Sequence, residues 1–269
     1  MDRGIYSKGQ IAAKYFSYYI KAFHSKGHGI HSPFVYRFIT DVLNDKRNFY
    51  AYNMVEEIRK QLLHNHSEVN VNDFGAGSAK MKTSRRKISD IASSSLSSLK
   101  YSRLLFRMIN YYQPQNILEL GTSLGVTTAY MAMANSYTNV LTIEGSEDIA
   151  AIAKNNFDTL GLTNINLVVG SFDDVLSPVV NQMQRVDFAF IDGNHRKEAT
   201  LNYFEELLAA VHNDSILVFD DIHWSREMET AWDIVKKNPS VTSSIDLFFW
   251  GIIFFRNQFK EKQHFTIRF

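Results

Sequence analysis

One segment near the middle of the chain constrains the fold more than any other. It begins with the apolar stretch 116–120, continues through the turn Gly121–Gly125, and reaches a second apolar stretch that ends on the acid Glu144. A strand, a glycine-bearing turn, a helix and a second strand ending on an acid are the layout of a βαβ unit that binds a nucleoside. Glycine lets the backbone of the turn approach a ligand closely. The acid can accept hydrogen bonds from both ribose hydroxyl groups.

The turn does not match the dinucleotide fingerprint. Ser123 occupies the second glycine position of G-x-G-x-x-G, and that glycine is the one that lets the backbone contact a pyrophosphate. The sequence therefore disfavours NAD and FAD. What it predicts is a nucleoside site without a pyrophosphate, and S-adenosylmethionine fits that description.

The same residues resemble a known family. The turn Glu119-x-Gly121-x-x-x-Gly125, the acid Glu144 at its spacing and the acids after later strands resemble the class I S-adenosylmethionine-dependent methyltransferases. Within that class the chain looks most like the small-molecule O-methyltransferases of the catechol and caffeoyl-coenzyme A type. The resemblance covers residues 88–255. It implies transfer of a methyl group from S-adenosylmethionine to a phenolic or similar hydroxyl group of a small molecule.

Strands and helices alternate from Asn116 onward. We expect strands over 116–120, 139–144, 164–169, 186–191 and 214–220, and helices over 125–135, 147–160, 172–182, 197–211 and 225–237. This alternation predicts an α/β fold with a doubly wound, mostly parallel sheet. Residues 245–255 lack room for a crossover helix and are expected to form an antiparallel pair at the sheet edge. The resemblance implies a seven-stranded, Rossmann-like sheet whose last strand is antiparallel.

The first 98 residues differ from the rest and are expected to form an N-terminal helical extension. Residues 99–269 are then the S-adenosylmethionine-binding domain. Helices are expected over 8–23, 33–44, 52–64, 88–97 and 99–112. The polar residues 66–87 predict a loop, and its Asp73–Ser78 imitates a glycine motif without a following helix. An aromatic stripe in the first helix is expected to pack in the core: Tyr15, Phe16, Tyr18, Tyr19 and Phe23.

Composition excludes several classes of protein. A length of 269 residues with 45% hydrophobic residues suits one α/β domain with an extension, and a net charge of +1 gives no global field for nucleic acid. The absence of cysteine excludes disulfides, thiolate metal sites and cysteine nucleophiles. The most apolar run, 247–255, is far shorter than the ~20 residues of a membrane helix. We expect a cytoplasmic protein, and we expect the basic run from Lys80 to Lys87 to be a solvated loop.

Candidate cofactor contacts follow the first three strands, because ligands of an open parallel sheet bind beyond the carboxyl ends of its strands. Backbone N–H groups at the start of a helix favour a carboxylate. Glu144 is the expected ribose ligand, and the resemblance places the residues after Gly170 beside the adenine. The candidates are Glu119, Gly121, Thr122, Ser123, Gly125, Glu144, Gly145, Ser171 and Phe172, with Asp192 beyond the fourth strand. Ser171 and Asp173 have the alternative role of capping a helix.

Carboxylates follow the fourth and fifth strands. Asp192 ends an apolar strand, where an isolated acid is costly unless it has a partner. Asp220 and Asp221 repel each other unless a cation or a proton lies between them. Three carboxylates offer oxygen ligands for Mg²⁺, so a metal site at Asp192, Asp220 and Asp221 is one expectation. The resembling metal-dependent enzymes carry Asp-Asn where this chain has Asp220-Asp221, which leaves the use of a metal open.

Two histidines lie close to these acids in the sequence. His195 follows Asp192 by three residues and His223 follows Asp221 by two. Either can act as the base that takes a proton from an attacking hydroxyl, since neutral imidazole is present near pH 7; a surface histidine is the ordinary alternative. The candidate catalytic residues are thus Asp192, His195 and His223. His28 and His31 lie in a glycine-flanked break and are candidates for a lid.

Rival functions remain open from the sequence. One is a metal-independent small-molecule methyltransferase with a histidine or carboxylate base, and another is a nucleoside-binding module without catalysis. Nucleic-acid methylation is disfavoured, because the chain has no basic face and no Asn-Pro-Pro-Tyr-like base-flipping motif. The expected partner is a small-molecule acceptor, without nucleic acid or membrane. A homodimer is left open.

Overall fold

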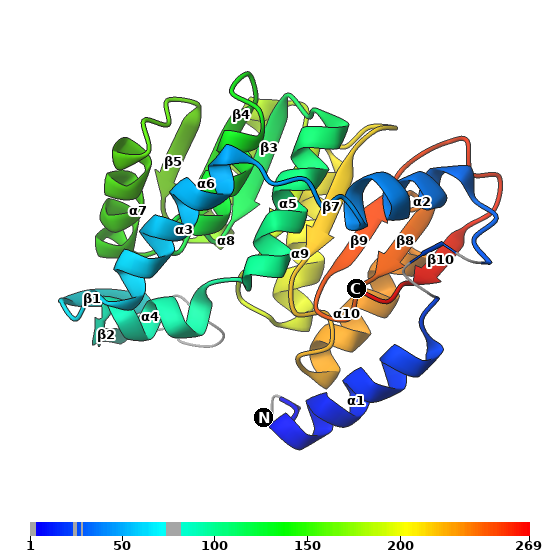
Figure 1. The fold of residues 1–269 in the computed structure, drawn as a ribbon, viewed down its shortest axis with the longest axis horizontal. Helices are drawn as coiled ribbons and strands as arrows, with labels where there is room; N and C mark the ends of the chain where they lie inside the picture. Colours follow the sequence, from blue (N-terminus) through cyan, green and yellow to red (C-terminus); the bar gives the residue numbers. More distant parts are fainter. Residues whose placement is uncertain (1–3, 24–25, 28, 74–81) are drawn as a thin grey trace. The chain divides into compact units, whose positions relative to one another are not determined.

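The computed structural model describes residues 4–23, 26–27, 29–73 and 82–269 (Figure 1). The chain forms two compact units, one of residues 45–175 and one of residues 1–44 with 176–269. Their strands belong to an eight-stranded sheet with the order β10-β8-β9-β7-β6-β3-β4-β5. The α/β fold with a mostly parallel sheet is confirmed. The division at residues 98 and 99 is not tested by this grouping and stays a prediction.

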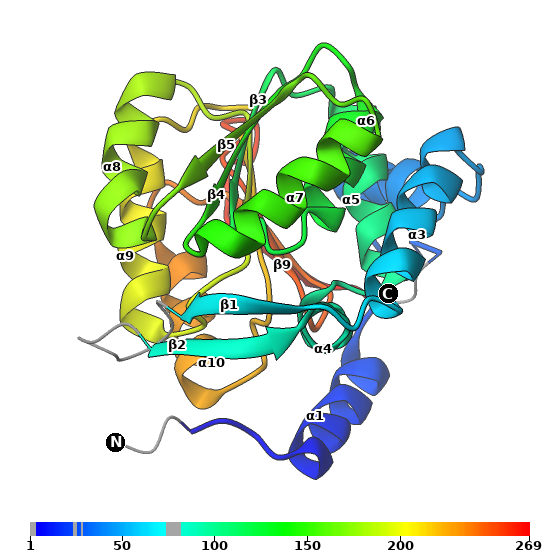
Figure 2. The ribbon, with the colours of Figure 1, turned by 90° about the vertical axis from the view of Figure 1, so that its left-hand side faces the viewer.

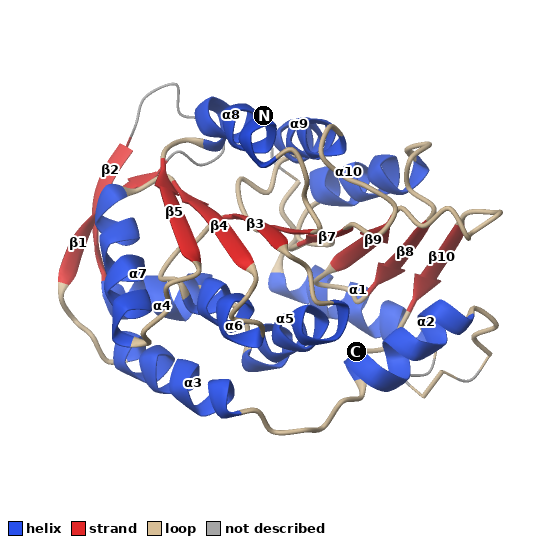
Figure 3. Ribbon diagram, turned by 90° about the horizontal axis from the view of Figure 1, so that it is seen from above, coloured by secondary structure: helices blue, strands red, loops and turns tan. Residues whose placement is uncertain are grey.

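The 45–175 unit contains the βαβ segment on which the sequence argument rests. Strands β3 (Asn116–Leu120), β4 (Asn139–Glu144) and β5 (Ile165–Val169) run parallel, with Glu119 opposite Thr142 and Glu144 opposite Val169. Three helices lie on one face of these strands (Figure 3): α5 (Leu99–Tyr112), α6 (Val126–Ala134) and α7 (Glu147–Thr159). Helix α3 (Tyr50–Leu63) and helix α4 (Ile88–Ser95) complete its helical part.

Helix α5 shows how local sequence sets an element boundary. Its buried positions recur at helical spacing, and it ends at Gln113, whose φ of 51° is left-handed. Pro114 follows and cannot continue the helix, because proline lacks the N–H group and its ring clashes with the preceding turn. The predicted range 99–112 is therefore reproduced.

Residues 66–87 were expected to form a loop, and that expectation is wrong for residues 68–73 and 82–87. They contain an antiparallel pair, β1 (Glu68–Asp73) and β2 (Lys82–Lys87), with Val69 opposite Arg86 and Val71 opposite Ser84. Figure 2 shows the two strands alongside α4. Val69 and Val71 pack against the core of this unit. Two alternating valines in a polar segment are a weak strand pattern, so packing decided the structure.

The second unit carries the remaining strands of the sheet. Strand β6 (Phe188–Ile191) pairs parallel with β7 (Ile216–Phe219), and β9 (Gly251–Phe254) runs antiparallel to both β7 and β8 (Ser243–Asp246). Helices α9 (Lys197–Leu208) and α10 (Arg226–Lys237) lie on one face of these strands, and α2 (Pro33–Arg37) lies on the other (Figure 3). Helix α1 (Lys8–Lys21) lies instead beyond the ends of the strands (Figure 1), where Lys14 pairs with Glu229 of α10. Helix α8 (Phe172–Met183) begins in one unit and ends in the other.

The sheet has one strand more than the seven expected. Strand β10 (Gln263–Thr266) pairs parallel with β8, and the sequence analysis assigned no strand there. Its four residues are too short to show a period, so only pairing identifies them. The expected helix over 33–44 also differs, because it consists of α2 followed by the π-helical segment η1 (Phe38–Leu43).

The aromatic stripe of α1 is only partly in the core. Tyr18 is buried and Tyr15 is half-buried, and both rings contact Phe248. Phe16, in contrast, is 66% exposed, and Tyr19 and Phe23 are exposed as well. The expectation of core packing is therefore wrong for these three rings. Within the described ranges, no helix is both long and apolar enough to cross a membrane.

Some predicted features fall outside the described residues. These are His28, Lys80 and residues 74–78 of the imitation glycine motif. His31 is described and exposed. Arg85 of the basic run is exposed and pairs with Glu68 at 3.0 Å, as a solvated surface charge would.

Candidate functional site

The turn between β3 and α6 is held in left-handed backbone conformations. Gly121 has φ 103°, Ser123 has φ 48° and Gly125, which precedes α6, has φ 80°. The N–H groups of Gly121 and Thr122 both donate to the carbonyl oxygen of Ile143 in β4, at 3.0 and 3.2 Å. The turn therefore lies against the end of β4 with its backbone fixed. Glycine avoids strain at 121 and 125, where φ values of 103° and 80° are unfavourable for residues with a Cβ atom.

Glu144 lies directly beside this turn. Its carboxylate accepts the N–H of Ser123 at 2.8 Å and the N–H of Ser146 at 3.0 Å. Burial raises the pKa of Glu144, while backbone hydrogen bonds from Ser146, Ser123 and Gly145 act in the opposite direction. The residue is half-buried. A carboxylate fixed at the end of β4, beside a glycine turn, is the arrangement that a ribose needs.

Glu119 has a different environment from the one the sequence suggested. Its side chain is fully buried and accepts hydrogen bonds from the hydroxyl groups of Thr127 at 2.8 Å, Thr128 at 2.5 Å and Thr142 at 2.6 Å. It thus joins β3, the first turn of α6 and β4. The structure gives Glu119 a supporting role for the turn, and its predicted contact with the cofactor stays a prediction. Hydroxyl partners at positions 127, 128 and 142 carry no recognisable sequence pattern.

The third strand end reaches the same region. The N–H of Gly170 donates to the carbonyl oxygen of Glu144 at 2.9 Å, and α8 then begins at Phe172. Ser171 accepts the N–H groups of Asp174 and Val175 through its carbonyl oxygen, and Ser171 and Phe172 are both half-buried. The structure therefore brings together the predicted residues at 121–125, 144–146 and 170–172.

Three hydrogen bonds at this site were missed by the sequence analysis. The hydroxyl of Ser95, at the end of α4, lies 2.9 Å from that of Ser123. The N–H of Asn70, in β1, donates to the Asp148 carboxylate at 3.1 Å, and the hydroxyl of Ser146 donates to the carbonyl oxygen of Asn70 at 3.4 Å. The β1–β2 pair and α4 thus border the turn and the start of α7. No motif marks these residues, because the contacts depend on tertiary packing.

In the second unit, carboxylates gather at the ends of β6 and β7. Asp220 has a pKa well above its usual range, because of burial first and then of the nearby charges of Asp192 and Asp221. A hydrogen bond between the side chains of Asp220 and Asp192 acts in the same direction. Two carboxyl groups can share such a bond only when one is protonated. Burial also raises the pKa of Asp221, whose φ is 54°.

His195 belongs to this group. Its Nε2 atom lies 3.5 Å from Oδ1 of Asp192, and its side chain is 32% exposed. The backbone is left-handed at Asn194 and at His195, with φ 64° and 29°. The Asn194 amide donates to the hydroxyl of the buried Tyr203 at 3.0 Å, which anchors the loop. The structure thus brings together the predicted residues Asp192, His195, Asp220 and Asp221.

His223 has other partners. Its Nδ1 atom lies 2.9 Å from Glu229 and its Nε2 atom 2.9 Å from Asp246. Burial lowers the pKa of His223, but the hydrogen bonds and charges of Asp246 and Glu229 outweigh burial and raise it. An imidazole with a carboxylate at each nitrogen is stabilised as the cation, which has no free lone pair to accept a proton. This geometry disfavours His223 as the base.

The acids do not fit a metal site in this structure. No group of three or more histidine, aspartate or glutamate side chains is arranged to hold an ion in the part of the chain that the structure describes. A proton between two carboxyl groups is the second arrangement that stabilises adjacent acids, and the raised pKa of Asp220 beside Asp192 is consistent with it.

Comparison with known proteins identifies a related domain whose range spans both groups of residues. Residues 118–222 match the family described as a methyltransferase domain, and this range contains the glycine turn, Glu144, Asp192, Asp220 and Asp221. This match supports a class I S-adenosylmethionine-dependent methyltransferase domain in this part of the chain. The chain is 32% identical over 126 residues to a catechol O-methyltransferase of Niastella koreensis, which covers 46% of this chain and 55% of that protein. The chain thus spans about half the length of that curated relative.

Solved structures share the fold of this chain at low sequence identity. An O-methyltransferase from Bacillus cereus in complex with SAH has a TM-score of 0.57 at 19% identity, covering 82% of this chain and 96% of that one. An SAH-bound methyltransferase from Podospora anserina has a TM-score of 0.60 at 13% identity, covering 94% of this chain and 99% of that one. At these identities the comparison supports the fold alone.

Proposed function

We propose that this methyltransferase transfers the methyl group of S-adenosylmethionine to a hydroxyl oxygen of a small molecule. The observation that carries the proposal is the glycine turn with Glu144 fixed beside it by the N–H groups of Ser123 and Ser146. Solved neighbours bound to SAH and a catechol O-methyltransferase relative support the cofactor and the reaction class.

In this proposal the glycine turn and its neighbours bind the cofactor. Glu144 accepts both ribose hydroxyls, and backbone N–H groups at the start of α6 receive the methionine carboxylate. Ser171 and Phe172 lie beside the adenine, one strand further along the same parallel sheet. Glu119 acts indirectly, because the hydrogen bonds that it accepts from three threonine hydroxyls join β3 to β4 and α6.

The acids and His195 supply the acid–base chemistry. The methyl of a sulfonium ion is already activated, so the protein mainly aligns the acceptor oxygen with the carbon–sulfur bond. His195 takes the proton of the acceptor hydroxyl, and Asp192 stabilises the imidazolium that forms. The oxygen–carbon bond forms as the carbon–sulfur bond breaks, which leaves S-adenosylhomocysteine and a methyl ether. A metal is not part of this proposal, because the described acids are not arranged as ligands.

Cofactor binding is tested first by thermal denaturation with S-adenosylhomocysteine. A ligand at a hundred times its dissociation constant adds about 2.7 kcal/mol to the stability of the folded chain. Glu144→Ala should remove most of this shift. Absence of any shift with the wild-type chain would refute the proposed cofactor site.

Turnover is tested with a panel of phenols, catechols and aliphatic alcohols, with and without EDTA. Asp192→Asn and His195→Gln should abolish methyl transfer while leaving S-adenosylhomocysteine binding intact, whereas the exposed Asp233→Asn serves as a control. Full activity of both site variants would refute the acid–base mechanism. Loss of activity in EDTA, restored by Mg²⁺, would favour the metal-assisted alternative. Cofactor binding without transfer to any acceptor would favour a nucleoside-binding module.

A further inference from the structure

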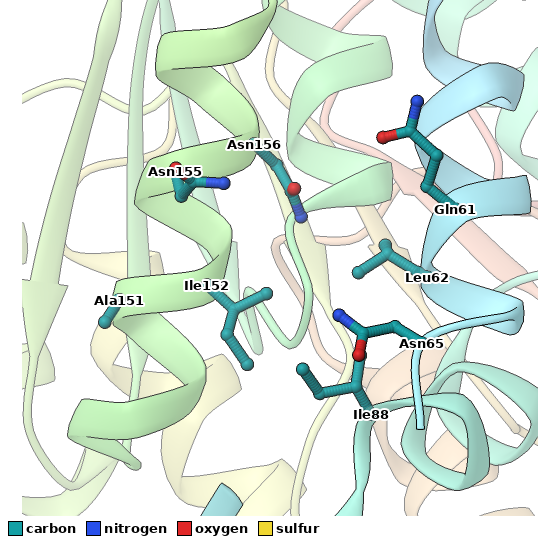
Figure 4. Close-up of a pocket in the computed structure, with 8 residues that line it drawn as sticks. All are labelled: Gln61, Leu62, Asn65, Ile88, Ala151, Ile152, Asn155 and Asn156. Atoms are coloured by element: carbon teal, nitrogen blue, oxygen red, sulfur yellow. The ribbon is translucent and has the colours of Figure 1, made fainter. Parts of the chain in front are cut away.

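A cavity lies within the 45–175 unit. It has a volume of about 370 Å³ and opens between the end of α3, the start of α4 and one face of α7 (Figure 4). Its lining residues are Gln61, Leu62, Asn65, Ile88, Ala151, Ile152, Asn155 and Asn156. None of them is among the predicted cofactor or catalytic residues. The volume lies within the range of ~300–1,000 Å³ that small-molecule sites occupy.

The lining has an unusual composition for a gap between helices. Four of the eight side chains are carboxamides and none is charged. In Figure 4 the amides of Asn155 and Asn156 extend from α7 toward those of Gln61 and Asn65 on the opposite wall. Leu62, Ile88 and Ile152 provide apolar surface between them. The cavity thus combines an apolar floor with converging polar groups, as ligand sites commonly do.

Much of the hydrogen-bonding capacity of these amides is open. Asn156 donates through Nδ2 to Leu124, and Asn65 accepts the N–H of Ser67 through Oδ1. Among the described residues, no side-chain hydrogen bond engages Asn156 Oδ1, Asn65 Nδ2 or the Asn155 amide. The walls therefore offer donors and acceptors together, which suits a ligand edge that also carries both.

We propose that this cavity binds a neutral, planar molecule with a carboxamide-like edge, and that its occupancy is coupled to cofactor binding. The neutral lining offers no counter-charge, so an anion or cation would lose hydration without compensation. A carboxamide, lactam or similar group pairs an N–H and a C=O with the facing side-chain amides. The apolar floor accepts the flat body of an aromatic ring.

The coupling runs through Asn156. Its Nδ2 atom donates to the carbonyl oxygen of Leu124 at 2.9 Å, and Leu124 belongs to the glycine turn. The next residue of α7, Phe157, lies against Gly125 of the same turn. A ligand that engages the free oxygen of Asn156 therefore acts on the side chain that holds the turn. By reciprocity, the cofactor must change the affinity for that ligand by the same factor.

The test uses nicotinamide and nicotinate as matched probes on the full chain, saturated with S-adenosylhomocysteine so that the cofactor site is filled. Both have a flat ring of the same size, but only nicotinamide is neutral and carries an amide. Nicotinamide at millimolar concentrations should shift the backbone NMR resonances of residues 61–65 and 151–156, and nicotinate should bind at least about tenfold more weakly. No shifts in these segments, or equal binding of both probes, would overturn the proposed site.

Two variants separate this cavity from other sites. Asn155→Leu removes one facing amide on the exposed side of α7 and should weaken nicotinamide binding at least about fivefold. Asn166→Leu makes the same change at an exposed position of β5 outside this cavity and should leave binding unchanged. Equal effects of both variants would place the probe elsewhere.

Calorimetric titration of the cofactor tests the coupling. The dissociation constant of S-adenosylhomocysteine should change when nicotinamide is saturating, and Asn156→Leu should abolish that change. If nicotinamide leaves the dissociation constant of S-adenosylhomocysteine unchanged in the wild-type chain, the coupling is refuted. The NMR result tests the proposed site separately.

Discussion

The glycine turn offers a quantitative test of the packing argument, through Gly125→Ala. The backbone at Gly125 has φ 80°, and a Cβ atom there would lie 2.5 Å from Cε1 and 2.8 Å from Cζ of Phe157 and 3.1 Å from Cβ of Ala153. Left-handed backbone costs a residue with a Cβ about 1–2 kcal/mol, and overpacking a buried site costs about 1–3 kcal/mol more. We therefore expect the free energy of unfolding to fall by about 2–5 kcal/mol.

Gly161→Ala is the matched control for the backbone contribution. Gly161 has φ 67° at the end of α7, but a Cβ atom there would meet nothing within 4 Å. It should cost only the left-handed strain, about 1–2 kcal/mol. The difference between the two variants then measures the clash with α7.

A double-mutant cycle with Phe157→Leu isolates the clash further. Leucine removes the ring that the new Cβ would meet, so the double variant should be less destabilised than the sum of the single variants, by about 0.5–3 kcal/mol. Urea denaturation gives the stabilities, and titration with S-adenosylhomocysteine reports whether the turn still binds the cofactor. If Gly125→Ala costs no more than Gly161→Ala, or if the cycle shows no coupling, the steric reasoning is wrong.

Three further predictions concern the acids. Burial raises the pKa of Glu144 above 4.5, so lowering the pH through the raised value should protonate Glu144 and weaken S-adenosylhomocysteine binding. Calorimetric titration should show this pH dependence in the wild-type chain and not in Glu144→Gln. Glu119→Ala leaves three buried hydroxyls without their acceptor and should lower the free energy of unfolding by about 3–5 kcal/mol in urea denaturation. A loss of less than about 1 kcal/mol would contradict the supporting role of Glu119. Glu229→Gln weakens bonds from Tyr6 (2.6 Å), Lys14 (2.9 Å) and His223 (2.9 Å) and should cost about 1–3 kcal/mol.

The pH dependence of the Glu229 effect has a definite sign. The pKa of Glu229 is lowered, because hydrogen bonds from Tyr6, Lys14 and His223 outweigh burial, so its contribution is present above pH 4.5 and lost as pH falls. The pKa of His223 is raised, so its contribution is present below pH 6.5 and lost as pH rises through the raised value. The stability difference between wild type and Glu229→Gln should therefore be largest between pH 4.5 and 6.5. A difference that is flat across pH 4–8 in thermal denaturation would contradict this linkage.

The boundaries of most elements followed from local patterns. Helix α5 was predicted to the residue, because its apolar spacing and Pro114 mark both its face and its end. Strand β3 and the turn at Gly121 were identified for a similar reason, since an apolar run followed by glycines has few other structures available. The β1–β2 pair and β10 were missed, because short polar strands show no clear period until a partner pairs with them.

The candidate site divides in the same way. Sequence indicated the residues at the ends of the strands, and the structure brings 121–125, 144–146 and 170–172 together as expected. The sequence did not indicate that three threonines surround Glu119, or that His223 lies between Glu229 and Asp246. Those partners come from other elements, and residue types alone do not reveal them.

The sequence by itself determined the βαβ segment, the parallel sheet and the acids at the strand ends, because glycine conformations and apolar periods are local properties of the chain. The tertiary structure alone decided what each acid does. Whether a carboxylate is buried among hydroxyls, as at Glu119, lies beside other carboxylates, as at Asp220, or faces a cation, as at Glu229, depends on groups distant in the chain. Burial and neighbouring charge set the ionisation of an acid, and both exist only once the chain has folded.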